Sequence, residues 1–159
     1  MRRMKVGTVM LIEIVSLVLA VLLMTGLMGK TGVLIYMFDV VTLLILLVLA
    51  LPALFANGLA GDFVRLFFKS KNRKECLGDL KKSLLAVQLL QKQFIYGALM
   101  TIALEIVVVL QYSLEPEILG DNLSVVAVTA FYLGIFELLL MPIKVAVEKR
   151  ITEHMERDA

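Results

Sequence analysis

Three glutamates lie inside long apolar stretches of the sequence, where ionisable residues are rare. Glu13, Glu105 and Glu137 are each flanked on both sides by apolar residues. An acid near the centre of a bilayer opposes helix insertion by about 2–3 kcal/mol, so its presence there calls for a function or a hydrogen-bonding partner. A carboxyl group in a membrane can bind and release a proton. Proton transfer is therefore the chemistry that these residues could perform.

A structural role is the alternative for the same three residues. A buried carboxyl group is either neutral, or has its charge compensated by water or by a partner. A neutral glutamate can also join two helices through a hydrogen bond, with no part in transport. The residue types and their spacing leave both interpretations open.

Four apolar stretches surround these glutamates, and each is long enough to cross a membrane as a helix. A crossing needs about 20 residues, and the stretches run over about residues 6–28, 40–60, 94–112 and 125–147. The chain of 159 residues is 60% hydrophobic, with a mean hydropathy of +0.94, an excess that a soluble domain of this size cannot bury. The first stretch exceeds the apolar core of a signal peptide. We predict an all-α, polytopic integral membrane protein that forms one membrane domain over residues 1–159.

The distribution of Lys and Arg predicts the orientation of the four spans. Basic residues favour short cytoplasmic segments. Of the 16 Lys and Arg residues, Lys30 alone falls on the opposite side from the others if both termini are cytoplasmic. The basic residues of the loop 61–93, which this topology places in the cytoplasm, are Arg65, Lys69, Lys71, Arg73, Lys74, Lys81, Lys82 and Lys92. We therefore expect N- and C-termini in the cytoplasm.

Within this topology the three glutamates fall in one central layer of the membrane. A helical rise of 1.5 Å per residue places Glu13 and Glu137 about 5 Å to the cytoplasmic side of their span centres, and Glu105 about 3 Å to the outer side. Small and polar residues at helical spacing are expected to share their faces and to let helices approach closely. These faces are predicted to comprise Gly97, Thr101 and Glu105 on the third span, and Ala127, Ala130, Gly134 and Glu137 on the fourth.

The outer loop and the fourth span resemble the MotA/TolQ/ExbB proton channel family, especially its MotA branch. Residues 113–120, SLEPEILG, resemble the acidic loop ending in Leu-Gly that precedes the last span of that family. In the span itself a threonine, Thr129, is followed thirteen residues later by a proline, Pro142. Phe38 and Asp39 at the outer start of the second span are also similar to that family. The loop 61–93 is much shorter than the large cytoplasmic domain of flagellar stators, so the resemblance is to a short member.

The resemblance implies a proton-conducting complex of the bacterial inner membrane. In this family identical subunits form a ring, a pentamer by resemblance, around a single-span MotB/ExbD/TolR-like membrane protein that normally supplies the ion-carrying aspartate. By position, Thr101 and Thr129 would line the ion path, and Pro142 would be the helix kink that transmits motion. Glu105 and Glu137 are additions to the family pattern, and we treat them as further candidates for the ion path. The role of Glu13 stays open.

Other functional classes find no support in the sequence. Its residues show no enzyme motif, no cofactor-binding or metal-ligand pattern, and a net charge of only +2, which does not indicate a nucleic-acid partner. We expect a transport component and not an enzyme, with the lipid bilayer and partner membrane proteins as its surroundings. A non-conducting membrane scaffold built from the same helix bundle is the competing class.

The topology can be tested at the single cysteine. Cys76 lies in the basic loop, so a membrane-impermeant thiol reagent should label it in inverted vesicles and not in intact cells. Mass spectrometry of the protein would measure the labelling, with Cys76→Ser as the blank. Labelling from outside intact cells would contradict the four-span arrangement.

Overall fold

The computed structural model describes residues 6–28, 39–67, 76–112 and 116–158, and every regular element in these ranges is a helix. The helices are α1 (Val6–Met28), α3 (Val40–Ala56), α4 (Ala60–Arg65), α5 (Leu77–Tyr112) and α6 (Pro116–Asp158). The described part of the chain contains no strand. The all-α prediction is therefore confirmed.

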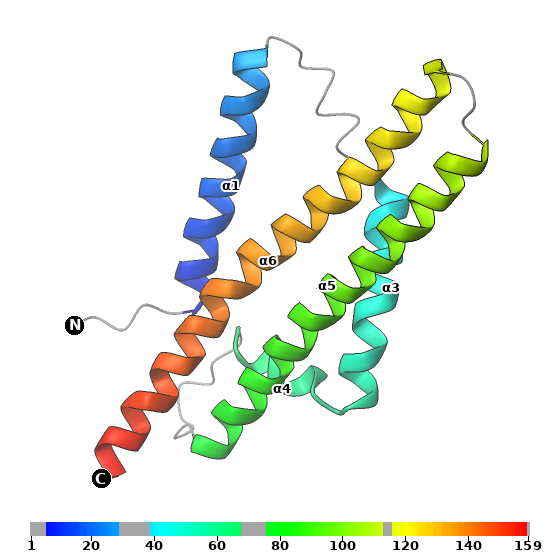
Figure 1. The fold of residues 1–159 in the computed structure, drawn as a ribbon. Coiled ribbons are helices and arrows are strands. Elements are labelled where there is room, and N and C mark those ends of the chain that lie inside the picture. The colour runs from blue at the N-terminus through cyan, green and yellow to red at the C-terminus, as the bar shows by residue number, and fades with distance from the viewer. Residues whose placement is uncertain (1–5, 29–38, 68–75, 113–115, 159) are drawn as a thin grey trace.

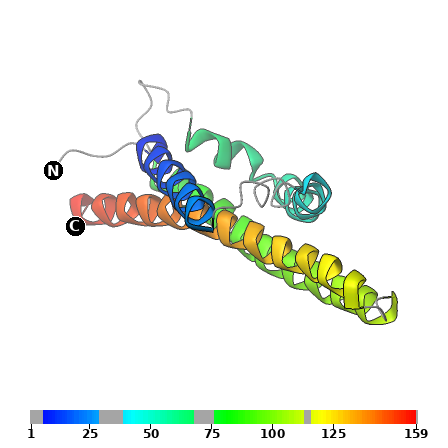
Figure 2. The ribbon, with the colours of Figure 1, turned by 90° about the horizontal axis from the view of Figure 1, so that it is seen from above.

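The two longest helices, α5 and α6, form the centre of the fold. They run side by side in opposite directions, with α3 against α5 and the lower part of α1 against α6 (Figure 1). The short α4 packs beside the N-terminal half of α5. Seen from above, α1 and α3 lie on the same side of the α5–α6 pair (Figure 2). Helices α5 and α6, which carry most of the candidate residues, thus form the most extensive helix–helix contact of the fold.

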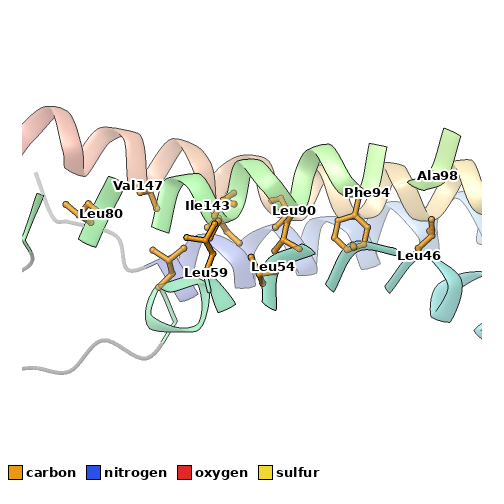
Figure 3. Packing of buried hydrophobic residues seen from close by; sticks show 14 of the residues in the cluster. Leu46, Leu54, Leu59, Leu80, Leu90, Phe94, Ala98, Ile143 and Val147 are labelled. Atoms are coloured by element: carbon orange, nitrogen blue, oxygen red, sulfur yellow. The ribbon is translucent and has the colours of Figure 1, made fainter. Parts of the chain in front are cut away.

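The contact between α5 and α6 follows a repeat of three and four residues, which is typical of coiled-coil packing. This α5–α6 seam carries Leu90, Phe94, Ile143 and Val147 among its apolar side chains (Figure 3). The buried positions that follow this spacing are Leu80, Ser83, Val87, Leu90, Phe94, Ala98 and Thr101 on α5, and Thr129, Tyr132, Leu140, Ile143, Val147 and Ile151 on α6. The half-buried Phe136 completes the repeat between Tyr132 and Leu140. The seam therefore continues past the apolar centre of both helices into their polar ends.

Helix α3 buries a narrow stripe against this pair and then ends in a turn. Its buried residues are Thr42, Leu46, Ala50 and Leu54, spaced four residues apart, the spacing that places side chains on one face of a helix. Gly58 follows with a φ of 67°, a left-handed conformation that glycine adopts without steric strain. The second apolar helix thus ends at Ala56, earlier than the predicted stretch 40–60, because this turn interrupts it.

The other predicted stretches differ from the helices mainly in length. Helix α1 has the predicted bounds 6–28. Residues 79–93 form an amphipathic segment with Leu80, Leu84 and Val87 at helical spacing. Helix α5 joins this segment to the apolar stretch 94–112 without a break, and α6 extends beyond 125–147 at both ends. At 36 and 43 residues, α5 and α6 are about 54 and 64 Å long, well beyond a bilayer core of about 30 Å. The predicted loop 61–93 therefore consists partly of α4 and of the first half of α5.

Much of the apolar surface of these helices faces outward. The described chain has two helices, over 77–111 and 123–157, that are long and apolar enough to cross a membrane, and two shorter apolar helices over 10–23 and 40–56. Only 28% and 17% of the most apolar windows of the two long helices are buried within the chain. A soluble protein rarely exposes so much contiguous apolar surface, so this surface has the character of a membrane protein.

Asp39 caps the N-terminus of α3. Its Oδ1 accepts hydrogen bonds from the backbone N–H groups of Val41 at 3.0 Å and Thr42 at 3.4 Å, and its Oδ2 accepts one from the Thr42 hydroxyl at 2.7 Å. The Thr42 hydroxyl is the main cause of a lowered pKa of Asp39, and the two backbone donors act in the same direction against partial burial. The ionised carboxylate therefore stabilises the start of this helix.

We expect Asp39→Ala to lower the free energy of unfolding by about 1 kcal/mol at neutral pH, the usual effect of removing an N-cap. Because the folded-state pKa lies below the ordinary value of 3.8, the ionised carboxylate stabilises the fold above that value. Its contribution is lost as the pH falls through the folded-state pKa. Chemical unfolding in detergent micelles, from neutral pH down through the pKa of Asp39, would measure the difference in unfolding free energy between the variant and the unmodified protein. Asp39→Asn, which can still cap, should keep most of the stability at neutral pH and lose this part of the pH dependence; an unchanged pH dependence would contradict the assignment.

Candidate functional site

Glu105 and Thr129 meet across the α5–α6 seam. The Thr129 hydroxyl lies 2.8 Å from Oε1 and 3.0 Å from Oε2 of Glu105, so it can donate to either carboxyl oxygen. Thr129 is fully buried, and its hydroxyl is also 3.3 Å from the Val125 carbonyl oxygen of its own helix. The structure thus brings together two of the residues that the sequence singles out, one from each long helix.

Thr101 lies one helical turn before Glu105 on the same face of α5. Its side chain is buried, and its hydroxyl donates to the Gly97 carbonyl oxygen at 2.9 Å. A Cβ placed on Gly97 would lie 3.4 Å from Leu49 Cβ of α3, so the absence of a side chain at this position lets the two helices approach closely. The predicted face Gly97–Thr101–Glu105 is therefore an interior face, directed toward α3 and α6.

An open groove of about 400 Å³ lies beside this face. Thr101 and Glu105 supply its polar groups, and the remaining walls are apolar. The apolar lining residues are Ile45 and Leu49 of α3, Met100, Leu104, Val108 and Val109 of α5, and Val125 of α6. Glu105 therefore contacts both the protein interior, through Thr129, and a groove that is open to the surroundings.

Glu137 lies at the same seam but pairs with a residue that the sequence reasoning missed. Gln91 Nε2 of α5 donates to Glu137 Oε2 at 3.1 Å, and the Gln91 side chain is buried. Gln91 follows Leu84 by seven residues and Val87 by four, so it belongs to the apolar face of the amphipathic segment. A polar residue on that face was the signal that could have identified it.

The predicted small-residue face of α6 is not part of the contact that Glu137 makes with α5. Ala127, Ala130 and Gly134 are exposed, and a Cβ on Gly134 would have no atom within 4 Å. Glu137 is instead half-buried and directed toward Gln91 on α5. The line of contact with α5 passes beside the small residues of α6 and not over them.

The two remaining candidates lie apart from these pairs. Glu13 is half-buried on α1, and in the described ranges no hydrogen bond connects it to Thr129 or Glu137. Pro142 lies inside α6, which continues as a helix to Asp158. The yellow and red halves of α6 run in different directions in Figure 2, consistent with the bend that an internal proline produces.

The site thus contains two polar pairs on one helix–helix seam, Glu105–Thr129 and Gln91–Glu137. Each consists of a carboxyl group and a neutral hydrogen-bond donor, the arrangement that allows a buried acid to exist in either protonation state. Comparison of the chain with protein-family models, with curated proteins and with solved structures gives no match.

The Glu105–Thr129 hydrogen bond should couple α5 to α6 energetically. In a double-mutant cycle of Glu105→Leu and Thr129→Val, we expect a coupling energy of about 0.6–1.7 kcal/mol, the range found for hydrogen bonds between membrane helices. Unfolding in mixed micelles would measure it. Thr101→Val serves as the control, because the Thr101 hydroxyl bonds within its own helix and should show no coupling to Glu105. Equal coupling in both cycles would contradict a specific bond.

Proposed function

We propose that this chain is a four-span protein of the bacterial inner membrane and a ring-forming subunit of a proton-conducting complex. In this proposal the complex couples ion flow to work on a partner, a single-span MotB/ExbD/TolR-like membrane protein. The observation that carries the proposal is the contact of Glu105 with Thr129 between two long apolar helices, beside an open groove. A protonatable group in that position can exchange protons with a path along the groove and the seam.

The outward-facing apolar surface supports the membrane location and the assembly. Leu104, Val107 and Leu110 of α5 are each more than half exposed, and such side chains are stable against lipid or against another subunit. Ala127, Ala130 and Gly134 form an exposed row of small residues on α6. A row of this kind lets a helix of a neighbouring subunit approach closely, as a ring of identical subunits requires.

The arrangement of charges supports the proposed topology. The first two turns of α5 carry Asp79, Lys81 and Lys82, and the last turns of α6 carry Lys149 and Arg157. These helices are antiparallel, so their charged ends lie together at one end of the seam (Figure 1). Basic residues at one end of apolar helices favour the cytoplasmic side, and the lengths of α5 and α6 allow them to project beyond the bilayer there.

A non-conducting scaffold is the second candidate, because both polar pairs also act as hydrogen bonds between helices. A glutamate that only joins two helices needs no path to water. In that case the same seam would hold the bundle in a shape suited to binding a partner membrane protein, and the groove would be a docking surface. Proton flux separates the two functions.

Proton flux should depend on the carboxyl groups of both pairs. In proteoliposomes carrying the complex as purified from membranes, we expect Glu105→Gln and Glu137→Gln to reduce flux about tenfold or more, because the amide keeps the size and hydrogen bonding but carries no exchangeable acid. Thr129→Val tests the hydroxyl at nearly constant shape. A pH-sensitive dye inside the vesicles would report the flux.

The control is Thr152→Val, since Thr152 is exposed near the end of α6 and bonds to Glu148 of its own helix. It should conduct like the unmodified protein. Normal flux in both glutamine variants with a loss in Thr129→Val would retain the channel and remove the glutamates from the path. The absence of flux from every preparation, including the unmodified complex, would favour the scaffold.

A further inference from the structure

The Gln91–Glu137 pair has one feature that the Glu105–Thr129 pair lacks. Glu137 Oε2 receives the Gln91 amide hydrogen at 3.1 Å, but Glu137 Oε1 is buried and accepts no hydrogen bond from the residues that the structure describes. The Thr129 hydroxyl has one hydrogen to donate and lies within 3.0 Å of both oxygens of Glu105, and Glu105, in contrast to the buried Oε1 of Glu137, also lines the open groove. The two acids of the seam therefore differ in how well the protein would support a negative charge.

A carboxylate with one oxygen buried and unpaired is unfavourable. Burial of a charge without full compensation opposes folding far more strongly than burial of a neutral polar group. A proton on Oε1 removes the charge and leaves Oε2 as the acceptor for Gln91. The Oε1 hydroxyl then has no acceptor among the described residues, but an unpaired neutral hydroxyl opposes folding much less than an unpaired charge. The geometry of the pair therefore fits a protonated carboxyl group.

No positively charged side chain of the described residues forms a hydrogen bond with Glu137 that would compensate a negative charge on its carboxyl group. On α5, Lys92 is exposed beside Gln91, and on α1 Glu13 is half-buried. Helix α3 contains no charged residue. On α6, Lys144 acts on Glu137 electrostatically but makes no hydrogen bond to it in the described part of the chain. It follows Glu137 by seven residues, about 10 Å along the helix, in the direction of the charged helix ends.

An aromatic barrier separates this pair from the Glu105–Thr129 pair. Phe94 of α5 and Phe136 of α6 stack across the seam, with ring centroids 4.0 Å apart and planes 7° from parallel. Along α5, Phe94 lies between Gln91 and Glu105. Along α6, Phe136 lies between Thr129 and Glu137. The stacked rings therefore occupy the seam between an outer and an inner polar pair.

We propose that Glu137 is a proton-binding residue and that Gln91 is its positioning residue, forming an inner station on the path of the proposed function. The proton on Oε1 leaves to water at the charged ends of the helices. The carboxylate left behind keeps the Gln91 hydrogen bond and the attraction of Lys144, until it takes up another proton from the side of Glu105. The Phe94–Phe136 stack lies between the two stations, so a proton passes from Glu105 to Glu137 only when the rings part and water connects them.

Infrared spectroscopy of the membrane-reconstituted full-length protein at neutral pH tests this assignment. Selective ¹³C labelling of the glutamate carboxyl groups identifies the C=O stretch of a protonated glutamate. We expect one such band to be lost in Glu137→Gln and kept in Glu105→Gln. In Gln91→Leu the band should move to higher frequency, because the carbonyl oxygen loses its hydrogen bond. Gln93→Leu, two residues away on the same helix, should leave the band in place.

Two outcomes would overturn the proposal. The first is a spectrum in which Glu137→Gln removes no protonated-carboxyl band, and the second is a Glu137 band that Gln91→Leu does not shift. Circular dichroism shows whether each variant keeps its helices, and the Gln91→Leu shift alone remains decisive if Glu137→Gln does not fold. The readout requires no transport. A Glu137 band in a protein without proton flux would contradict the proposed function and retain the proton site.

Discussion

The hydrogen bonds of two half-buried glutamates constrain how α5 and α6 pack. The Thr101 hydroxyl, one turn from Glu105, bonds within its own helix, and the hydrogen-bond partners of both glutamates come from the facing helix. Thr129 and Gln91 supply these partners at 2.8 and 3.1 Å. Apolar packing alone tolerates small shifts of one helix along another, whereas two polar pairs at separate levels fix the alignment. The close approach of α3 at Gly97 and the groove beside Glu105 both depend on that alignment.

The same seam serves two regions with different surroundings. Its middle part lies between helices that expose apolar side chains, as lipid or neighbouring subunits require. Its end, near Leu80, Val147 and Ile151, lies between polar faces that carry lysines and acids. A single continuous packing repeat joins these two regions.

Much of the helical fold follows from the sequence, because a long apolar stretch without breaking residues favours one continuous helix. Helix α1 coincides with the predicted stretch of about residues 6–28, and α5 and α6 contain the stretches of about 94–112 and 125–147. The end of α3 was placed too late, since the turn at Asn57 and Gly58 is a local backbone feature that the apolar run conceals. The helical spacing of Gly97, Thr101 and Glu105 correctly grouped them on one interior face.

The sequence by itself determined the helical class, the apolar stretches and which acids lie within them, because composition and periodicity are properties of each segment alone. The tertiary structure decided the partners. Thr129 faces Glu105, and Gln91, which no motif marked, faces Glu137, because the packing of α5 on α6 brings together residues 24 and 46 positions apart. It also left Ala127, Ala130 and Gly134 exposed. Which face of a helix contacts a given neighbour depends on the side-chain packing of both helices together, so it cannot be predicted from either segment alone.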